Sequence, residues 1–169
     1  MAEIEPAKPS DCEGIERVLQ AAFDDGSEAE LVAVLRESED LRVGCSMVAR
    51  ADDIVGYAAV SNATLVGSPN VELSVLGPVA VAPNRQNEGI GTTLVRTTIR
   101  ACKRSGCDAV VLTGDPDFYD RFGFEPAAAF DLESDLDSPP DAFQVWPCWP
   151  KALDGVGGLV RHPVPFHAL

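Results

Sequence analysis

The clearest chemical signal in the sequence is a pair of glycines that opens a predicted helix. An apolar segment at residues 79–81 runs through a loop into Gly89-Ile90-Gly91-Thr92, and apolar residues at helical spacing follow. Free N–H groups and the helix dipole make such an N-terminus a site for phosphate oxygens, and glycine lets a ligand approach the backbone closely. The same pair is expected if the glycines only let the helix pack against the strand, so both interpretations stay open at this point.

Two common phosphate-binding motifs do not fit this segment. A Walker loop ends in Gly-Lys-Ser/Thr, and residues 83–94 contain no lysine, which disfavours nucleoside triphosphate hydrolysis. The dinucleotide fingerprint Gly-x-Gly-x-x-Gly also fails, because Leu94 stands where its third glycine belongs.

The loop instead resembles motif A of the GNAT acetyltransferases, Gln/Arg-x-x-Gly-x-Gly/Ala, which Gln86 to Gly91 match in full. Downstream, GDPDFYDRFGFEP at residues 114–126 resembles motif B, in which a tyrosine on a short helix precedes a Gly-Phe pair; here these are Tyr119 and Gly123-Phe124. This segment and the ending ALDGVGGLVRHPVPF are similar to the YhbS-like subgroup in particular. The resemblance covers essentially the whole chain.

The resemblance implies acetyl-CoA as cosubstrate and no metal. GNAT proteins splay neighbouring strands apart at a β-bulge and bind acetyl-CoA in the gap. Gly77-Pro78 is the expected break, because glycine tolerates unusual dihedral angles and proline lacks a ladder N–H. Beyond the break, free backbone groups are expected to pair with the pantetheine amides as an added strand would, and the N–H groups of residues 87–92 to contact the pyrophosphate. The expected cofactor-binding residues are Val79, Ala80, Val81, Gln86, Asn87, Glu88, Gly89, Ile90, Gly91 and Thr92.

The reaction implied by the resemblance is direct attack of a primary amine on the thioester. An N–H of Val79 or Ala80 is expected to polarise the carbonyl, and Tyr119 to protonate the CoA sulfur as general acid. Tyr119 is otherwise a packed aromatic, although Phe118 and Phe122 are better suited to an apolar helix face. The alternative function is a non-catalytic acyl-CoA-binding or regulatory module. The acceptor is a small-molecule or peptide amine of unidentified structure.

The sequence does not identify a general base. Some relatives place a glutamate on the strand before the break, and the corresponding residue here is Val75. Glu72 lies three residues away, an odd offset that directs it to the other face of a strand, so Glu72 is a candidate only if a bulge intervenes. Deprotonation through water is the alternative. His162 and His167 are too isolated in the sequence to be assigned a role.

Hydrophobic periodicity predicts the elements that hold these residues. The first helix starts at Ser10 or Asp11 and carries apolar residues at positions 15, 18, 19, 22 and 23; the second spans residues 28–36, with Leu31, Val34 and Leu35 inward. Further helices are expected at residues 89–103 and from Asp115-Pro116 to Gly123. Strands are expected at residues 3–5, 46–51, 54–66, 70–81, 108–113, from 124, and 143–146, with a polar loop at 131–141 and a mostly irregular end.

This order predicts a mixed α/β (α+β) fold, and the resemblance implies that it is the GNAT fold. The central sheet would be mostly antiparallel, with about six to seven strands and about four flanking helices. A chain of 169 residues is expected to form a single domain, residues 1–169.

The amino-acid composition limits the kinds of binding partner that we expect. With 27 acidic and 13 basic residues the formal net charge is −14, which disfavours nucleic acid. The acidic residues are scattered along the sequence, whereas steering of amine substrates requires negative charge focused at one site. This favours a generally acidic composition, such as that of halophile proteins, over substrate steering. The five cysteines lack Cys-x-x-Cys spacing and fit reduced apolar residues better than a zinc site. No signal peptide or membrane span is evident, so the expected protein is a cytoplasmic monomer or homodimer.

Overall fold

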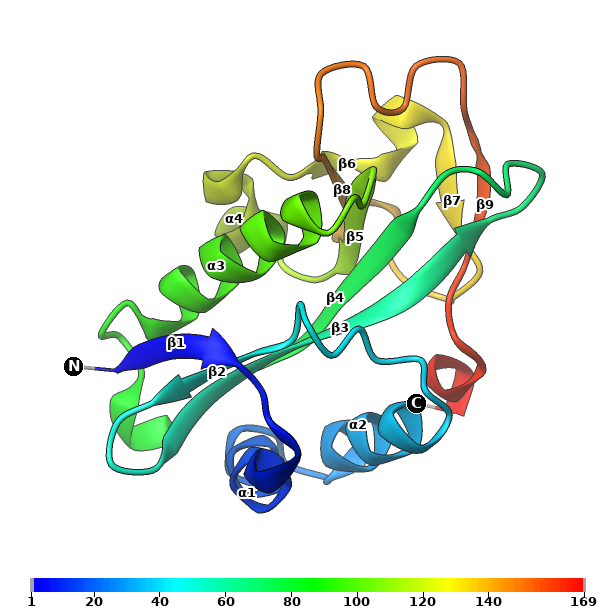
Figure 1. Ribbon diagram of the computed structural model, residues 1–169. Helices are drawn as coiled ribbons and strands as arrows, with labels where there is room; N and C mark the ends of the chain where they lie inside the picture. Colours follow the sequence, from blue (N-terminus) through cyan, green and yellow to red (C-terminus); the bar gives the residue numbers. More distant parts are fainter. Residues whose placement is uncertain (1, 169) are drawn as a thin grey trace.

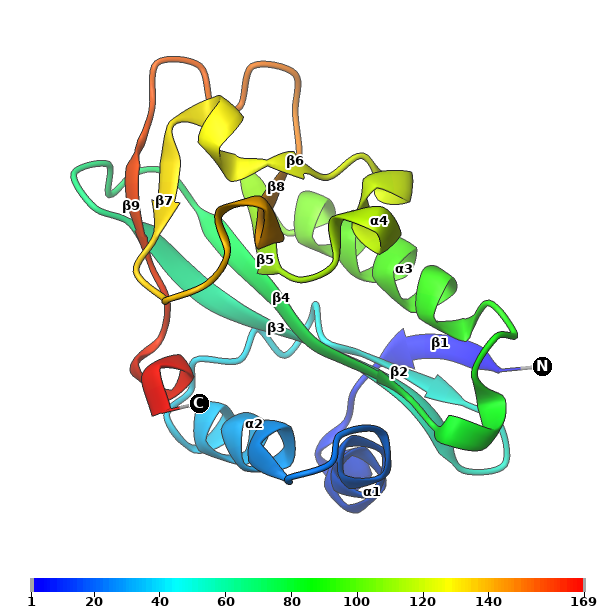
Figure 2. The ribbon, with the colours of Figure 1, turned by 180° about the vertical axis from the view of Figure 1, so that it is seen from behind.

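A computed structural model of the chain describes residues 2–168 as one sheet with helices on both of its faces (Figures 1 and 2). The main path of the sheet runs β1-β2-β3-β4-β5-β8-β6. Neighbours on this path are antiparallel except β4 and β5, which are parallel. The strands are β1 (Glu3–Pro6), β2 (Met47–Arg50), β3 (Ile54–Leu65), β4 (Leu73–Val81), β5 (Ala109–Thr113), β8 (Phe143–Pro147) and β6 (Glu125–Pro126).

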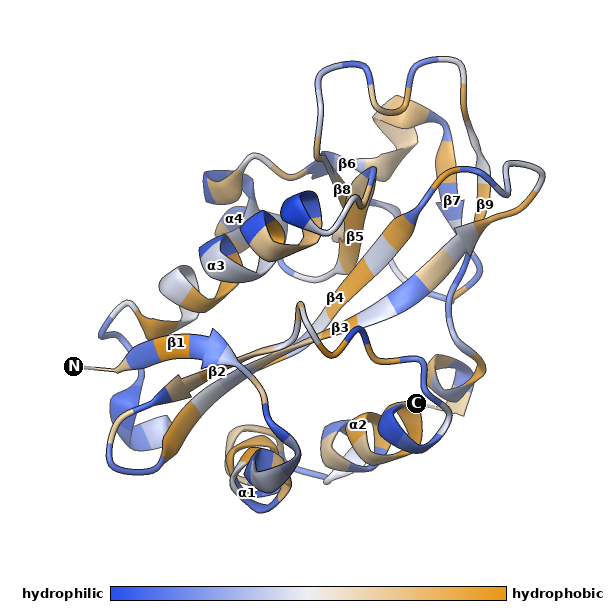
Figure 3. Ribbon diagram, in the orientation of Figure 1, coloured by the Kyte–Doolittle hydropathy of each residue, from blue (hydrophilic) through white to orange (hydrophobic). Residues whose placement is uncertain are grey.

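The helices bury the apolar stripes that their periodicity predicts. α1 (Cys12–Ala22) and α2 (Ser27–Glu37) cover one face of the sheet, and α3 (Ile90–Arg104) and the short α4 (Pro116–Tyr119) lie on the other (Figures 1 and 2). The predicted stripe of α3, from Ile90 to Cys102, is buried against the sheet. The stripe of α2 differs from the prediction: Val34 is 40% exposed, and Val32 is buried in its place. Figure 3 shows the hydrophobic residues along β4 and β5, between the two layers.

The sheet opens between β4 and β5. These strands pair only at Leu73–Val75, whose partners are Ala109–Val111, and β4 then continues to Val81 without β5 beside it. On its other edge, β4 pairs with β3 through a bulge. Ala58 faces Val79 and Val60 faces Leu76, so Gly77 and Pro78 together oppose one residue of β3. The predicted break at Gly77-Pro78 is confirmed, and Gly77 has a φ of 134°, which favours glycine.

Two further strands lie in segments that the sequence predicted to be loop or irregular. β7 (Leu132–Ser134) and β9 (Gly158–Arg161) pair in parallel, and β9 also pairs with the end of β3, where Leu65 faces Val160. These strands are too short to show a hydrophobic period in the sequence. β9 forms by pairing with the end of β3, and β7 by pairing with β9. The sheet therefore has nine strands within residues 2–168, against the six to seven expected.

The start of α3 yields the first prediction, a matched pair of glycine substitutions. Gly89 has a φ of 85°, whereas Gly91 is helical and a Cβ there would lie 3.6 Å from Val81 Cγ2, an ordinary contact. We expect Gly89→Ala to lower the free energy of unfolding by about 1–2 kcal/mol because alanine is strained at positive φ. Gly91→Ala should leave stability unchanged or raise it by up to about 1 kcal/mol. Urea unfolding of both variants measures this, and equal stabilities would contradict the left-handed backbone at residue 89.

Candidate functional site

The loop from β4 to α3 presents a run of backbone N–H groups with no protein acceptor. Asn87 and Gly89 both have positive φ, which turns the chain sharply into the helix. The first N–H in this region with a backbone acceptor is that of Thr93, bonded to Gly89 O at 3.1 Å. Within residues 2–168, the N–H groups of residues 87–92 have no hydrogen-bond acceptor, so this end of a 15-residue helix can receive an anion.

These N–H groups border a groove of about 580 Å³ between β4, the start of α3, and α4. Its lining includes most of the cofactor-binding residues predicted from the sequence: Val79, Val81, Gln86, Asn87, Gly89, Ile90, Gly91 and Thr92. Ala80 and Glu88 do not line it. Ala80 is buried against α1 on the other face of β4, and Glu88 binds Arg85 at 3.0 Å. Contact of all ten residues with a cofactor remains a prediction.

The groove is electropositive although the chain as a whole is acidic. Arg85 and Arg121 line it, and none of its lining residues in the described chain is a carboxylate, although Arg85 is paired with Glu88 beside the groove. Arg121 is held in place, because its Nε donates to Phe118 O at 2.8 Å and its guanidinium lies 4.5 Å from the Phe118 ring centroid. Sequence reasoning missed both arginines. The signal was present, since Arg121 stands two residues after Tyr119 within the same motif.

Tyr119 is positioned by its own short helix. Asp115 caps α4 by accepting from the Asp117 N–H at 3.0 Å, as predicted. The Tyr119 ring packs edge-on against Phe118, with centroids 4.9 Å apart, and lies over Gly114, where a Cβ would be only 2.7 Å from Tyr119 Cε2. The side chain lines the groove, and its hydroxyl has no hydrogen-bond partner within residues 2–168. Burial raises the pKa of Tyr119, so the phenol is protonated at neutral pH.

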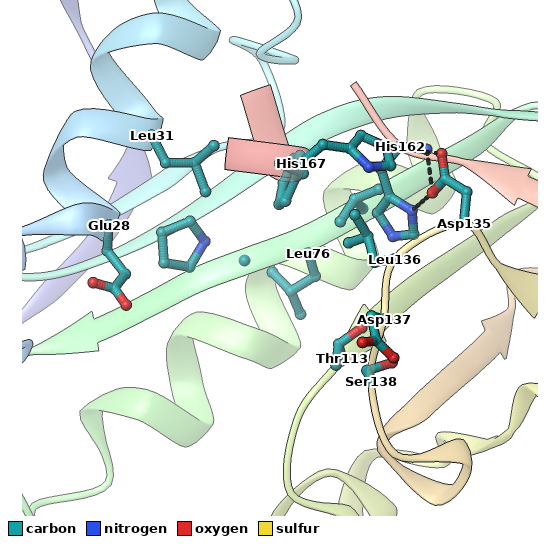
Figure 4. A pocket seen from close by; sticks show the side chains of 14 residues that line it. Glu28, Leu31, Leu76, Thr113, Asp135, Leu136, Asp137, Ser138, His162 and His167 are labelled. Carbon is teal, nitrogen blue, oxygen red and sulfur yellow. Dashed lines mark hydrogen bonds and ion pairs between the residues drawn. The ribbon is translucent and has the colours of Figure 1, made fainter. Parts of the chain in front are cut away.

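A second cavity, of about 540 Å³, lies on the α2 side of β4. Val75, Leu76, Gly77 and Pro78 form one wall, directly before the β4 residues that line the groove, so the two cavities adjoin consecutive parts of β4 just beyond its last pair with β5. Val75, which holds the position of the base in some relatives, faces this cavity. The other walls come from α2, the end of β5, the loop after β7 and the C-terminal segment: Glu28, Leu31, Thr113, Asp135, Leu136, Asp137, Ser138, His162, Phe166 and His167 (Figure 4).

Glu72, the sequence candidate for a base, is elsewhere. It precedes β4 and lies 4.0 Å from Arg42 in a different depression, and its side chain is 61% exposed. The structure therefore does not bring Glu72 to either cavity at the strand opening.

The cavity instead contains a histidine pair that sequence reasoning left unassigned. The Asp135 carboxylate lies between two rings, with His162 Nδ1 at 2.7 Å from Oδ1 and His167 Nε2 at 3.0 Å from Oδ2 (Figure 4). Because a carboxylate only accepts, both ring nitrogens donate to it. Burial alone would raise the pKa of Asp135, but the hydrogen bonds from His162 outweigh it and the pKa lies below its usual range. Burial also lowers the pKa of His162, which is therefore neutral at neutral pH. No group able to hold a metal ion is present within residues 2–168.

The comparisons with known proteins agree with this geometry. The model of the acetyltransferase (GNAT) family matches residues 12–124. The chain is 35% identical over 159 residues to the uncharacterized N-acetyltransferase YhbS of Escherichia coli (strain K12), covering 94% of this chain and 95% of that protein. It is 39% identical over 121 residues to the uncharacterized N-acetyltransferase YjhQ of the same strain, covering 70% of this chain and 67% of that one.

Solved structures match over nearly the whole chain. The structure of E. coli YhbS in complex with CoA superposes with a TM-score of 0.92 at 35% identity, covering 98% of this chain and 91% of that one. A GNAT family acetyltransferase from Brucella melitensis in complex with acetyl-CoA superposes with a TM-score of 0.80 at 30% identity, covering 98% of each chain. The separated strands, the open N–H groups before α3 and the tyrosine on α4 thus occur in a chain that belongs to the GNAT family of acetyltransferases.

Proposed function

We propose that this protein is an N-acetyltransferase that moves an acetyl group from acetyl-CoA to a primary amine by direct attack. The observation that carries the proposal is the opening of the sheet beyond Val75 and Val111, with an electropositive groove on one side of β4 and a separate cavity on the other. One substrate can reach the opening from each cavity. The family and the relatives solved with CoA and acetyl-CoA support acetyl-CoA as the cosubstrate.

In the proposed complex, acetyl-CoA occupies the groove. Val79 and Val81 lie on the stretch of β4 that β5 leaves unpaired, so their free backbone groups can pair with the pantetheine amides. The pyrophosphate would lie against the N–H groups of residues 87–92, with Arg85 and Arg121 adding positive charge. The backbone of Ala80 also belongs to this edge, although its side chain faces α1.

Transfer then needs four events at one point. The neutral amine nitrogen forms a bond to the acetyl carbonyl carbon, the carbon–sulfur bond breaks, the sulfur gains a proton, and the amine loses a proton to water. A backbone N–H of Val79 or Ala80 stabilises the developing negative charge on the carbonyl oxygen. Tyr119 supplies the proton to the sulfur, since its phenol is protonated, lines the groove and has no competing partner in the described chain.

We further propose that the protein acts in the cytoplasm as a single domain, residues 1–169, without a nucleic-acid or membrane partner. Its five cysteines are free, and four of them are buried, which suits a reducing compartment. The net charge of −14 opposes binding to phosphate backbones. No helix within residues 2–168 is long and apolar enough to cross a bilayer.

The first test is cofactor binding. Calorimetry should show CoA binding to the wild-type protein, weakened about tenfold or more by Arg121→Gln, because a charge-assisted contact to phosphate contributes about 1.5–3 kcal/mol. Arg100→Gln is the matched control, since Arg100 is exposed on α3 and does not line the groove. Equal CoA affinity of the two variants would place the phosphates elsewhere. An amine panel with acetyl-CoA and detection of released thiol then tests transfer itself.

The second test addresses Tyr119. Tyr119→Phe removes one oxygen and keeps the ring, so CoA affinity and stability should barely change. The rate of acetyl transfer should fall by about 10²–10⁴-fold, the usual contribution of a general acid. The loss should shrink with a thioester whose thiol is more acidic, because a stabler thiolate needs less protonation. An unchanged rate with acetyl-CoA would reduce Tyr119 to a packed aromatic.

Gly114 provides an independent test of the same role. Because a Cβ at this position would lie 2.7 Å from Tyr119 Cε2, Gly114→Ala should displace the ring without removing the hydroxyl. We expect a lower transfer rate with CoA binding retained, and addition of Tyr119→Phe should cost little more, since both changes remove the same proton donor. Fully multiplicative losses in the double variant would show that Gly114 acts in another way.

A further inference from the structure

The cavity on the α2 side of β4 has a charge pattern opposite to that of the cofactor groove. Glu28, Asp135 and Asp137 line it, and no lysine or arginine does so within the described residues. Burial lowers the pKa of His162, so this histidine is neutral at neutral pH and does not offset these charges. A ligand that enters this cavity therefore meets an excess of negative charge, which favours a cation.

Glu28 has an oxygen that lacks a partner. Its Oε2 is buried, and no hydrogen-bond donor reaches it from residues 2–168. A buried carboxylate oxygen without a donor is costly and uncommon in a native protein. No basic side chain in the described residues forms an ion pair with Glu28 or Asp137, although other acids of the protein have such partners. Because Glu28 also lines the cavity, a cationic ligand there can donate to this carboxylate.

The acids lie at two separate places in the cavity. Figure 4 shows Glu28 on one side, on α2, and Asp135 and Asp137 on the other, on the loop after β7, with Leu76 between them. The walls between the two anionic ends are largely apolar and are formed by Leu31, Val75, Leu76 and Phe166. The arrangement matches a molecule with a positive charge at each end and a chain of methylene groups between.

The Asp135 cluster holds one of these ends in place. Oδ1 of Asp135 accepts from the His162 backbone N–H at 3.1 Å and from its ring, and Oδ2 accepts from His167. The His162 side chain is only 1% exposed and packs between the rings of Phe143 and Phe166. The loop that carries Asp137 is thereby tied to the C-terminal segment.

From these observations we infer that the acceptor binds as a dication, an aliphatic diamine or a compound that presents two such amines, with Glu28 binding one ammonium group and Asp137 the other. The ammonium group that reacts loses its proton to water before its nitrogen attacks the thioester. This inference rests on the proposed function, because it assigns the acceptor of the proposed transfer. The cavity volume of about 540 Å³ suits a small molecule. Acetylation converts one amine to a neutral amide and leaves a product with a single charge, which one carboxylate no longer binds, so product release is favoured.

The test compares two probes that differ by one ammonium group, putrescine and n-butylamine. Each is titrated by calorimetry into the full-length protein saturated with CoA, which fills the groove without allowing reaction. Putrescine should bind about tenfold more tightly or better, since it gains a second charge-assisted contact. Glu28→Gln and Asp137→Asn should each reduce putrescine affinity to about that of n-butylamine. Glu30→Gln is the matched control, because Glu30 is exposed on the same helix and does not line the cavity.

The outcomes separate this inference from the proposed function. Equal affinity of the two probes, no detectable binding of putrescine, or unchanged affinity in Glu28→Gln would overturn the dication inference even if CoA binds and other amines are acetylated. Failure of CoA to bind would instead contradict the proposed function, and the same titrations on the free protein would still decide whether the cavity selects a dication. Thiol release from acetyl-CoA with putrescine, lost in Glu28→Gln but retained in Glu30→Gln, would support both.

Discussion

The separation of β4 from β5 after the Val75–Val111 pair is the constraint on which the rest of the structure depends. Parallel strands that stayed paired would close the sheet and leave no backbone edge for a ligand. The bulge at Gly77-Pro78 bends β4 away while β3 continues to pair with Val79–Val81 on its other edge. The β4 backbone therefore stays ordered and is free on one side only. A cofactor that needs backbone hydrogen bonds in an extended register can bind along this free edge.

The same opening separates two regions of opposite charge. Arg85, Arg121 and the open N–H groups before α3 lie on the groove side, whereas three carboxylates lie on the α2 side. A local positive region is unexpected in a chain with a net charge of −14, and the proposed binding of the cofactor phosphates would account for it. The acids of the second cavity come from distant segments of the sequence, so counting acids along the chain treats them as scattered. Folding brings three of them to one cavity, so electrostatic attraction of a cationic substrate has a structural basis in addition to a generally acidic composition.

Sequence reasoning succeeded where the chemistry lies in contiguous residues. The strand, loop and helix around Gln86–Gly91, the bulge at Gly77-Pro78 and the cap at Asp115 are local patterns with fixed spacing, and all are present in the structure. It failed where position depends on distant pairing. β9 forms by pairing with Thr64 and Leu65 at the end of β3, and β7 forms by pairing with β9. The sequence does not fix how wide the buried stripe of a helix is or where its edges lie. Val34 was therefore expected to be buried, whereas α2 packs with Val32 buried and Val34 partly exposed.

The difference between local patterns and distant pairing also explains why the sequence predicted one cavity better than the other. The groove is built almost entirely from residues 79–121, in one stretch whose turns and caps are set by neighbours in sequence. The second cavity joins α2, β4, the loop after β7 and the C-terminal segment, and its histidine pair becomes a unit only through Asp135. A cofactor presents the same phosphates and amides whatever the acceptor, so a local motif suffices to bind it. A cavity assembled from several remote segments can change its charge or depth through any one of them without disturbing the groove. If the acceptor binds there as proposed, its recognition is physically separate from that of the cofactor, and a short motif encodes only the cofactor site.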